Sequence, residues 1–373
     1  MKTLLTLLTS TAVLFLGCNQ PPQETSLVID YSQEVFISGE EGYACYRIPA
    51  IISPEEGKLI AFAEGRKRGC SDTGDIDLVM KTSLDGGKSW SPLQLIWDSG
   101  ENTSGNPAPI LDKSTGDIHL LCTWNLGTDK ESQIIDRTSE GGRHVYVIRS
   151  SDQGKSWEEP REMTSSVKDT SWTWYATGPG SGMQIQNGKY PGRLVLGCDH
   201  IEAESKKYYS HLIYSDDHGK SWQLGGTTPK DQVNECEVAE LSDGRLMLNM
   251  RNYDRSQKLR QVAYSEDGGL SWTAQQHDNS LIEPICQASI QSYFSGEQHM
   301  LFFTNPADTA SRVNMTLRMS PDDGHTWPTS LVLHVGPAAY SDLVIEDEIM
   351  GCLFEAGEEN PYERIVFTRF RID

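Results

Sequence analysis

Residues Ser83-Leu-Asp85-Gly-Gly87-Lys-Ser-Trp90 carry serine, aspartate, glycine and tryptophan at a spacing that decides the fold of this chain. The same phrase, with a threonine for the second serine in the last copy, returns at Ser150–Trp157, Ser215–Trp222, Ser265–Trp272 and Ser320–Trp327. The aspartate can accept hydrogen bonds from nearby backbone N–H groups, and the glycine supplies the positive φ that a tight turn needs. The tryptophan packs a large ring beside the turn. Each copy therefore predicts a β-hairpin turn with its own anchor.

The copies of this phrase lie about 50 to 70 residues apart, close to the length of one four-stranded unit with variable loops. Repeats of this period favour a radial array of sheets over one globular core. Short runs rich in Val, Ile, Leu and aromatic residues separate the turns, for example at 35–37, 59–63, 118–124 and 300–303. We find no convincing helical period, and residues 165–179 read as a long loop. The sequence therefore predicts an all-β chain.

The net charge and the N-terminal residues limit the partners and the cellular location that we expect. The formal net charge is −21 over 373 residues, which argues against nucleic acid and anionic membrane surfaces as partners. Residues 1–17 have the lysine and the apolar run of a secretory signal peptide, too short to span a membrane. Residues 15–18 resemble the lipobox of bacterial lipoproteins. We therefore expect lipid on Cys18, a tether over 18–30, one domain over 31–373, and a secreted protein at the outer membrane, on the cell surface or in the periplasm.

The repeated phrase is the Asp box, also called the BNR repeat, and with it the chain resembles the bacterial exo-sialidases. The resemblance covers essentially the whole chain after the expected signal peptide and implies a six-bladed β-propeller. Three arginines of this family grip the carboxylate of the substrate. Arg47, in an Arg-Ile-Pro motif at 47–49, matches the first. Arg251, in the run Asn-Met-Arg-Asn at 249–252, matches the second, and Arg312, in Ser-Arg-Val-Asn at 311–314, matches the third.

The acidic loop at 71–77 resembles the segment in which sialidases carry their acid/base aspartate. Asp72 is the position that fits, and Asp75 is the alternative. Asp77 is expected to serve structure. Arg66, just before this loop, resembles the additional arginine that faces the sugar ring in the family.

Three further residues match the rest of the family's site. Glu235 fits the buried glutamate that precedes the second arginine, and Glu237, two residues on, is the alternative. Tyr340, in Ala-Tyr-Ser-Asp at 339–342, resembles the nucleophile. Glu355 resembles the glutamate that braces Arg47.

The chemistry explains why these residue types are needed. A sialic acid carries its carboxylate on the anomeric carbon, where guanidinium groups can bind it by planar, bidentate hydrogen bonds that lysines cannot reproduce. A local arginine cluster also lets an acidic protein capture an anion. Sialidases use a tyrosine nucleophile where most glycosidases use a carboxylate. A neutral tyrosine avoids repulsion by the anionic anomeric centre, and a nearby glutamate can take its proton.

These residues lead us to expect an exo-α-sialidase that cleaves sialylated glycans with retention, as a monomer without metal or cofactor. One alternative is a propeller that binds sialoglycans without cleaving them. The set of Asp72, Glu235 and Tyr340 argues against it, because a lectin has no use for them. Another alternative is a trans-sialidase or an anhydro-forming variant, which would keep the same catalytic groups.

Seven cysteines follow Cys18 at irregular spacing, which is a poor disulfide framework and a poor metal site. Most are expected to be small buried hydrophobic residues. Cys45 and Cys70 are the exception, because each lies two residues from a proposed site residue. If both segments line one pocket, the two sulfurs could form a disulfide, and the alternative is a pair of free thiols.

Overall fold

A computed structural model describes residues 26–296, 298–347 and 349–373 of the chain. The expected signal peptide, Cys18 and all but the last five residues of the expected tether lie outside these ranges. Apart from two short helices, α1 (Glu131–Ile135) and α2 (Thr164–Val167), the regular elements described are β-strands. No helix within the described ranges is long and apolar enough to cross a membrane. The all-β class is therefore confirmed.

In the described ranges the strands form four hydrogen-bonded sheets. The sheet that holds both described ends runs β1 (Leu27–Ile37), β24 (Arg364–Ile372), β23 (Ile349–Ala356), β22 (Thr329–Glu346), β21 (Val313–Ser320), β20 (Gln298–Pro306) and β19 (Ser289–Ser295). The next runs β2 (Cys45–Glu55), β3 (Lys58–Arg66), β4 (Ile76–Ser83), β6 (Thr103–Leu111), β7 (Ile118–Asn125), β8 (His144–Ser150) and β9 (Arg161–Glu162), with β5 (Gln94–Trp97) paired to β4.

The two remaining sheets come from the middle of the chain. One runs β10 (Trp172–Thr177), β12 (Leu194–Glu202), β13 (Tyr208–Ser215) and β14 (Gln223–Thr227), with β11 (Met183–Gln184) paired to β12. The other runs β15 (Val233–Glu240), β16 (Leu246–Asn252), β17 (Leu259–Ser265) and β18 (Gln276–Ile282).

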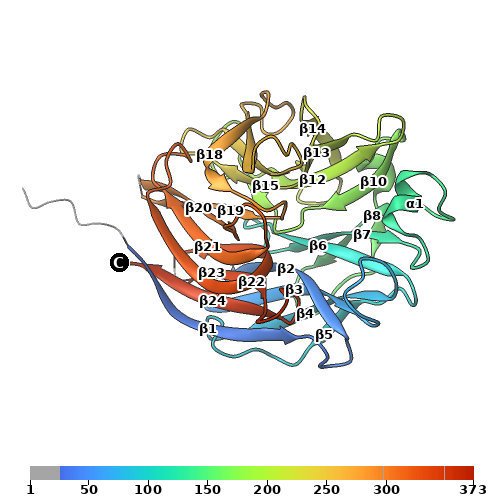
Figure 1. Cartoon of the computed structure of the whole chain (residues 1–373), viewed down its shortest axis with the longest axis horizontal. Coiled ribbons are helices and arrows are strands. Elements are labelled where there is room, and N and C mark those ends of the chain that lie inside the picture. Colours follow the sequence, from blue (N-terminus) through green and yellow to red (C-terminus); the bar gives the residue numbers. More distant parts are fainter. Residues whose placement is uncertain (1–25, 297, 348) are drawn as a thin grey trace, which may run out of the picture.

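The sheets follow one another around a common centre in chain order (Figure 1). β1, in blue, lies beside β24, in red, so the two ends of the described chain meet in one sheet. This strand begins at Leu27, four residues before the expected start of the domain. The reason is that Leu27 pairs with Ile372 and buries its side chain among the apolar residues of the same sheet.

Each Asp box directly follows the strand that ends at its serine. In the first box, the Gly87 N–H donates to Ser83 Oγ at 2.8 Å, and Asp85 Oδ1 accepts from the Ser89 N–H at 2.9 Å. The other four boxes repeat both bonds. The predicted turn chemistry is therefore confirmed at all five positions.

The box glycines also pack closely against residues of another repeat. Gly87 has a φ of 92°, and a Cβ there would fall 2.2 Å from the ring of Phe367 in β24. The glycines of the other boxes approach a residue of the preceding repeat in the same way, in turn Ile60, His119, Leu212 and Met247. Each box is thus a contact between consecutive units as well as a turn.

Residues 165–179, expected to form a loop, contain most of α2 and the whole of β10. Trp, Thr and Tyr favour strands because their side chains pack well on a pleated surface. Tyr175 is fully buried and pairs with His200 of β12. The density of Trp and Thr was therefore a strand signal, and the loop prediction was wrong.

Candidate active site

Three β-bulges lie at or directly beside predicted site residues. Residues 48–49 in β2, 234–235 in β15 and 339–340 in β22 each face a single residue of the neighbouring strand. Such a bulge interrupts the alternation of a strand and changes the direction of its side chains. Opposite the second and third bulges stand Arg251 and Glu355. Local backbone irregularity thus directs the side chains that form the cluster.

Tyr340 lies at the centre of this cluster. Its hydroxyl donates a short hydrogen bond to Oε1 of Glu235 and accepts one from Nη1 of Arg251 at 3.0 Å. The same Nη1 donates to Oε2 of Glu235 at 2.6 Å. Burial of the ring, and then the charge of Glu235, raise the pKa of Tyr340 well above its ordinary value, although the arginines lower it. The hydroxyl is therefore a neutral phenol that donates to the carboxyl group of Glu235.

The three predicted arginines meet around this tyrosine. The Arg47 guanidinium lies 4.9 Å from the centre of the Tyr340 ring, and the Arg312 guanidinium lies 5.6 Å from it. Arg251 completes the set through its bond to the hydroxyl. Three positive charges, from β2, β16 and the residue directly before β21, thus converge on one aromatic ring.

Glu355 holds Arg47 and Tyr340 together. Its two oxygens accept from Nε of Arg47 at 2.9 Å and from Nη2 at 3.2 Å. They also accept from the backbone N–H groups of Ile48 and Tyr340, each at 3.0 Å. Ile48 has a φ of 57°, which is unusual for a β-branched residue, and its bond to Glu355 helps to fix that conformation. The expected bracing contact is present.

Asp72 faces the cluster from the loop between β3 and β4. Its Oδ1 lies 2.8 Å from Nη1 of Arg66 and 3.3 Å from Nη1 of Arg47. Its side chain is 66% exposed, whereas those of Arg66 and Arg47 are 2% and 6% exposed. Partial desolvation by the surrounding protein raises the pKa of Asp72 although much of the side chain is exposed. The charges of Arg66 and Arg47 outweigh this effect, so the pKa lies below the ordinary value. Asp72 is thus the open, ionised member of the cluster.

The other two aspartates of that loop differ from Asp72. Asp77 is buried, accepts from the Tyr43 hydroxyl at 2.7 Å and pairs with Lys67 at 3.0 Å, in keeping with a structural role. Asp75 contributes its backbone carbonyl to a turn bond from Lys67. Asp72 is therefore the aspartate that the structure brings to the arginines.

Glu237, the alternative to Glu235, faces another part of the molecule. Its Oε2 accepts from the Ile290 N–H at 2.7 Å, and it lines a separate cavity of about 260 Å³ with Ser181 and Glu346. Burial, and then the neighbouring carboxyl of Asp342, raise the pKa of Glu237 well above its ordinary value. The bulge at 234–235 breaks the period of two, so the two glutamates do not share a face.

Tyr362 belongs to the cluster but was missed by sequence reasoning. Its hydroxyl accepts from Nη1 of Arg312 at 3.0 Å, and its ring lies 4.2 Å from the Arg47 guanidinium. It sits in an irregular segment after β23, where no motif marks it. Glu64, which accepts from Arg66 Nη2 at 2.6 Å, could have been found. It lies two residues before Arg66, on the same face of β3.

A further set of charged residues surrounds the cluster and was also not predicted. Arg143 donates to Asn106 Oδ1 at 2.5 Å, and burial lowers its pKa to about 10. Burial also raises the pKa of Glu131, in α1, and that of Asp199, in β12. Within the described ranges, no group of three or more His, Cys, Asp or Glu side chains is placed to hold a metal ion.

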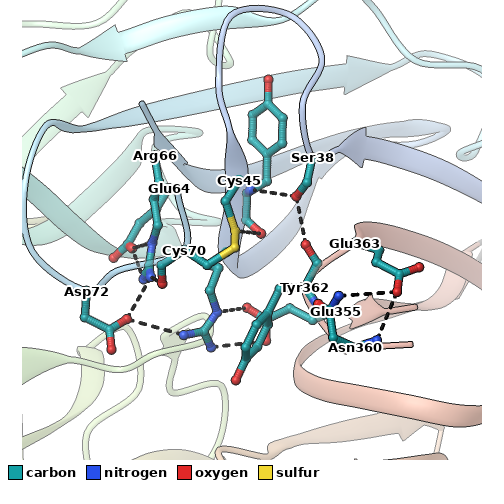
Figure 2. Close-up of a disulfide and its surroundings, with 12 residues drawn as sticks. Ser38, Cys45, Glu64, Arg66, Cys70, Asp72, Glu355, Asn360, Tyr362 and Glu363 are labelled. Atoms are coloured by element: carbon teal, nitrogen blue, oxygen red, sulfur yellow. Dashed lines mark hydrogen bonds and ion pairs between the residues drawn. A yellow bond between two sulfur atoms is a disulfide. The ribbon is translucent and has the colours of Figure 1, made fainter. Parts of the chain in front are cut away.

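Cys45 and Cys70 form a disulfide, with their Cα atoms 5.3 Å apart. Figure 2 shows this bond beside Arg66 and Asp72. The conditional expectation is thereby confirmed. The other five cysteines described are free and buried, as predicted for most of them.

Comparison with known proteins assigns the family. Residues 57–352 match the family described as BNR repeat-like domain. A sialidase of Micromonospora viridifaciens is 32% identical, over 91% of this chain and 54% of that protein. A sialidase of Bacteroides fragilis is 30% identical, over 86% of this chain and 61% of that protein. The chain thus spans between about half and two thirds of these two relatives.

Shorter relatives and solved structures agree. An exo-alpha-sialidase of Aspergillus fumigatus is 31% identical, over 89% of this chain and 85% of that protein. The solved structure of the Hadza microbial sialidase Hz136 is 30% identical, covers 91% of this chain and 68% of its own, and has a TM-score of 0.81. Trypanosoma rangeli sialidase, at 20% identity and a TM-score of 0.72, covers 93% of this chain and 59% of its own and shares the fold. The chain belongs to the sialidase family with BNR repeats.

Proposed function

We propose that the chain is a retaining exo-α-sialidase that releases terminal sialic acids from glycoproteins, glycolipids and oligosaccharides. The observation that carries the proposal is the Tyr340 hydroxyl, bonded to Glu235 and Arg251 while two more arginines flank its ring. A carboxylate on the anomeric carbon would be held by the guanidinium groups directly beside this hydroxyl. The names of the relatives support the same activity.

In the first step Tyr340 attacks the anomeric carbon while Glu235 takes the phenolic proton. Asp72 gives its proton to the leaving oxygen, so the glycosidic bond breaks as the tyrosyl bond forms. In the second step Asp72 takes a proton from water, which attacks the same carbon, and Glu235 returns its proton to Tyr340. Each step inverts the anomeric centre, and two inversions give retention. The exposed position of Asp72 suits a group that must meet both the leaving sugar and water.

Substrate capture changes the ion pairs of the resting site. Arg47 contacts both Glu355 and Asp72 before substrate arrives. The substrate carboxylate supplies a new negative partner for Arg47, and this weakens its hold on Asp72. Asp72 also gains a negative neighbour, which raises its pKa and favours the protonated form needed for the first step.

We propose six four-stranded blades for the fold. β22 supports this division, because its first half pairs with β21 and its second half with β23. The sheet that runs from β1 to β19 can thus be divided into two blades that share the long strand β22. β4 and β6 meet through a single parallel pairing, Ile76 with Thr103, which is a natural boundary within the sheet that begins at β2. The contact of Gly87 with Phe367 would close the ring between the first and last blades.

We also propose that residues 1–17 are removed as a signal peptide and that Cys18 is lipidated. The support is the apolar run ending at Phe-Leu-Gly-Cys. The lipid would hold the protein at the outer membrane or cell surface, or in the periplasm, and would be its only membrane contact. We also propose that the protein is a monomer. Cys18→Ser should move the protein from the membrane fraction to the soluble fraction.

Digestion of 3′-sialyllactose, followed by ¹H NMR, tests the activity. The expected first product is free sialic acid in the α configuration, formed without added metal. Initial β product would refute retention. Binding without turnover would favour the sialoglycan-binding alternative, and an anhydro or transferred sugar would favour the other enzyme classes.

A further inference from the structure

The Cys45–Cys70 disulfide joins two parts of the candidate site. Cys45 begins β2, two residues before Arg47, and Cys70 lies in the loop between β3 and β4, two residues before Asp72. Figure 2 shows the sulfur bridge between the strand and this loop, with Asp72 on the same side as Arg66. The carbonyl of Cys70 also accepts from Nη1 of Arg66 at 2.7 Å. The disulfide therefore ties the loop to β2 at a point two residues from Asp72, the proposed acid.

The other contacts of the loop between β3 and β4 are of two kinds. Some hold the end of the loop that leads into β4, and the others are interactions with charged side chains. Gly74 is bonded to Thr103 through both its N–H, at 3.3 Å, and its carbonyl, at 2.9 Å. Between this point and β3, Asp72 is held by its ion pairs with Arg66 and Arg47. Both pairs weaken when Asp72 is protonated, and a substrate carboxylate competes for Arg47. The disulfide is unaffected by protonation and by substrate.

We propose that Cys45 and Cys70 are positioning residues, whose disulfide keeps Asp72 within reach of the leaving oxygen while its ion pairs loosen. The inference rests on the proposed function and adds to it a covalent tether for the acid. It concerns proton transfer to the leaving group. Carboxylate binding by Arg251 and Arg312 does not depend on this tether.

Two substrates separate this role from a general structural one. Lactose is a poor leaving group and needs a proton as the glycosidic bond breaks, whereas 4-nitrophenolate leaves without one. The ratio kcat/KM covers events up to the first bond cleavage, so the later activation of water does not affect it. Loss of acid positioning should therefore lower kcat/KM for 3′-sialyllactose and largely spare the 4-nitrophenyl α-sialoside.

The test compares the wild type, the double variant Cys45→Ser with Cys70→Ser, and the control Cys122→Ser, in which a free buried cysteine is changed. The double variant should lose about 10- to 100-fold in kcat/KM on sialyllactose. This is less than the roughly 10²- to 10⁴-fold of general acid catalysis, because the acid is misplaced and not removed. The loss on the nitrophenyl substrate should be less than about threefold. The control should keep the wild-type ratio of the two rates.

Reduction provides the same comparison without a mutation. Cys70 is exposed, so dithiothreitol can donate two electrons and two protons to the bridge and become a cyclic disulfide itself. Treated wild type, assayed below its unfolding temperature and checked by thiol labelling, should behave like the double variant. The double variant should be unaffected by the reagent.

The positioning role would be overturned if the folded, reduced enzyme lost kcat/KM equally on both substrates, or lost none on either. Both outcomes would leave the proposed function intact. Failure of the untreated wild type on both substrates would instead count against the proposed function itself. The two failures are therefore distinguishable.

Discussion

Nη1 of Arg66 lies 2.8 Å from Oδ1 of Asp72, so the proposed acid rests against a positive charge. This contact favours the ionised form of Asp72, whereas the proposed first step requires the protonated form. Partial desolvation raises the pKa of the Asp72 carboxyl, but Arg66 and Arg47 together lower it by more, so the net shift is downward. The same arginine that holds the acid in place therefore sets the pH range in which it can act.

Arg66→Gln should move the alkaline limb of kcat/KM for sialyllactose to higher pH by about one unit. Removing the positive neighbour raises the pKa of Asp72, so the carboxyl stays protonated to higher pH. The pH profile of the variant measures this shift separately from any general loss of rate. Arg68→Gln is the control, because Arg68 lies in the same loop as Asp72 but forms an exposed ion pair with Glu101. This variant should leave the alkaline limb of the pH profile unchanged. An unmoved limb in Arg66→Gln would show that another group controls the profile.

Changing any one of Arg47, Arg251 or Arg312 to lysine should lower kcat/KM. The corresponding rise in activation free energy should be about 1.5–3 kcal/mol, the scale of a hydrogen bond to a charged group. Lysine keeps the charge but cannot form the planar pair of bonds to a carboxylate. Steady-state kinetics on an aryl sialoside measure the loss. Arg371→Lys, at a half-exposed position near the C-terminus, serves as control. A variant with wild-type kinetics would exclude that arginine from carboxylate binding.

Glu355→Gln should lower the free energy of unfolding by about 3 kcal/mol, because the buried guanidinium of Arg47 loses its buried negative partner and keeps only the exposed Asp72. It should also raise KM, since Arg47 loses its fixed orientation. Denaturant unfolding and kinetics measure the two effects. Glu346→Gln breaks a half-exposed pair with Lys113 and should cost less than about 1 kcal/mol. Equal stability losses in the two variants would contradict the importance of the buried pair.

Asp85→Ala should destabilise the first Asp box by about 1 kcal/mol, as loss of a comparable side-chain cap does in helices. The bonds from Ser89 and Ser83 lower the pKa of Asp85 to about 2. A lowered pKa stabilises the fold above the ordinary value near 3.8, and this contribution is lost as the pH falls towards 2. Thermal unfolding of variant and wild type should therefore differ at pH 6 and converge towards pH 2. Asp347→Asn, at an exposed turn, should match the wild type throughout.

The turns were predictable because their chemistry is local. In an Asp box, the groups that bond to each other lie within seven residues, so the sequence alone specifies the turn. The resemblance also selected Arg47, Glu235 and Tyr340, which come from three strands and meet in space. Their convergence depends on bulges, and no residue pattern marks the extra residue at 48–49, 234–235 or 339–340.

What the sequence missed depends on contacts between distant segments. Tyr362 reaches Arg47 and Arg312 from an irregular segment, and its neighbours in sequence give no sign of either contact. Leu27 joins β1 because a C-terminal strand offers Ile372 as its partner. Glu237 was the alternative to Glu235 for the base, and the bulge at 234–235 separates the two by directing Glu235 towards Tyr340.

The nucleophile prediction tests the whole arrangement. A 2,3-difluoro sialic acid should form a covalent adduct on Tyr340 with loss of fluoride from carbon 2. Fluoride is a good leaving group, so the adduct forms, whereas the electron-withdrawing fluorine at carbon 3 slows its hydrolysis. The pKa of Tyr340 lies well above its ordinary value, so the free phenol is a poor nucleophile at working pH. The proposed attack should therefore depend on Glu235, which already accepts the hydroxyl hydrogen bond. Peptide mass mapping locates the adduct.

Two variants complete this test. Tyr340→Phe should abolish trapping and keep the fold, because the ring and its packing against Arg47 and Arg312 remain. Glu235→Gln should keep the contact with the hydroxyl but slow trapping by about 10²- to 10⁴-fold, the usual contribution of a general base. Tyr253→Phe, which keeps its ring beside Arg251, is the matched control and should be trapped like the wild type. An adduct on Asp72 or Glu235, or undiminished trapping in Tyr340→Phe, would refute a tyrosine nucleophile at this position.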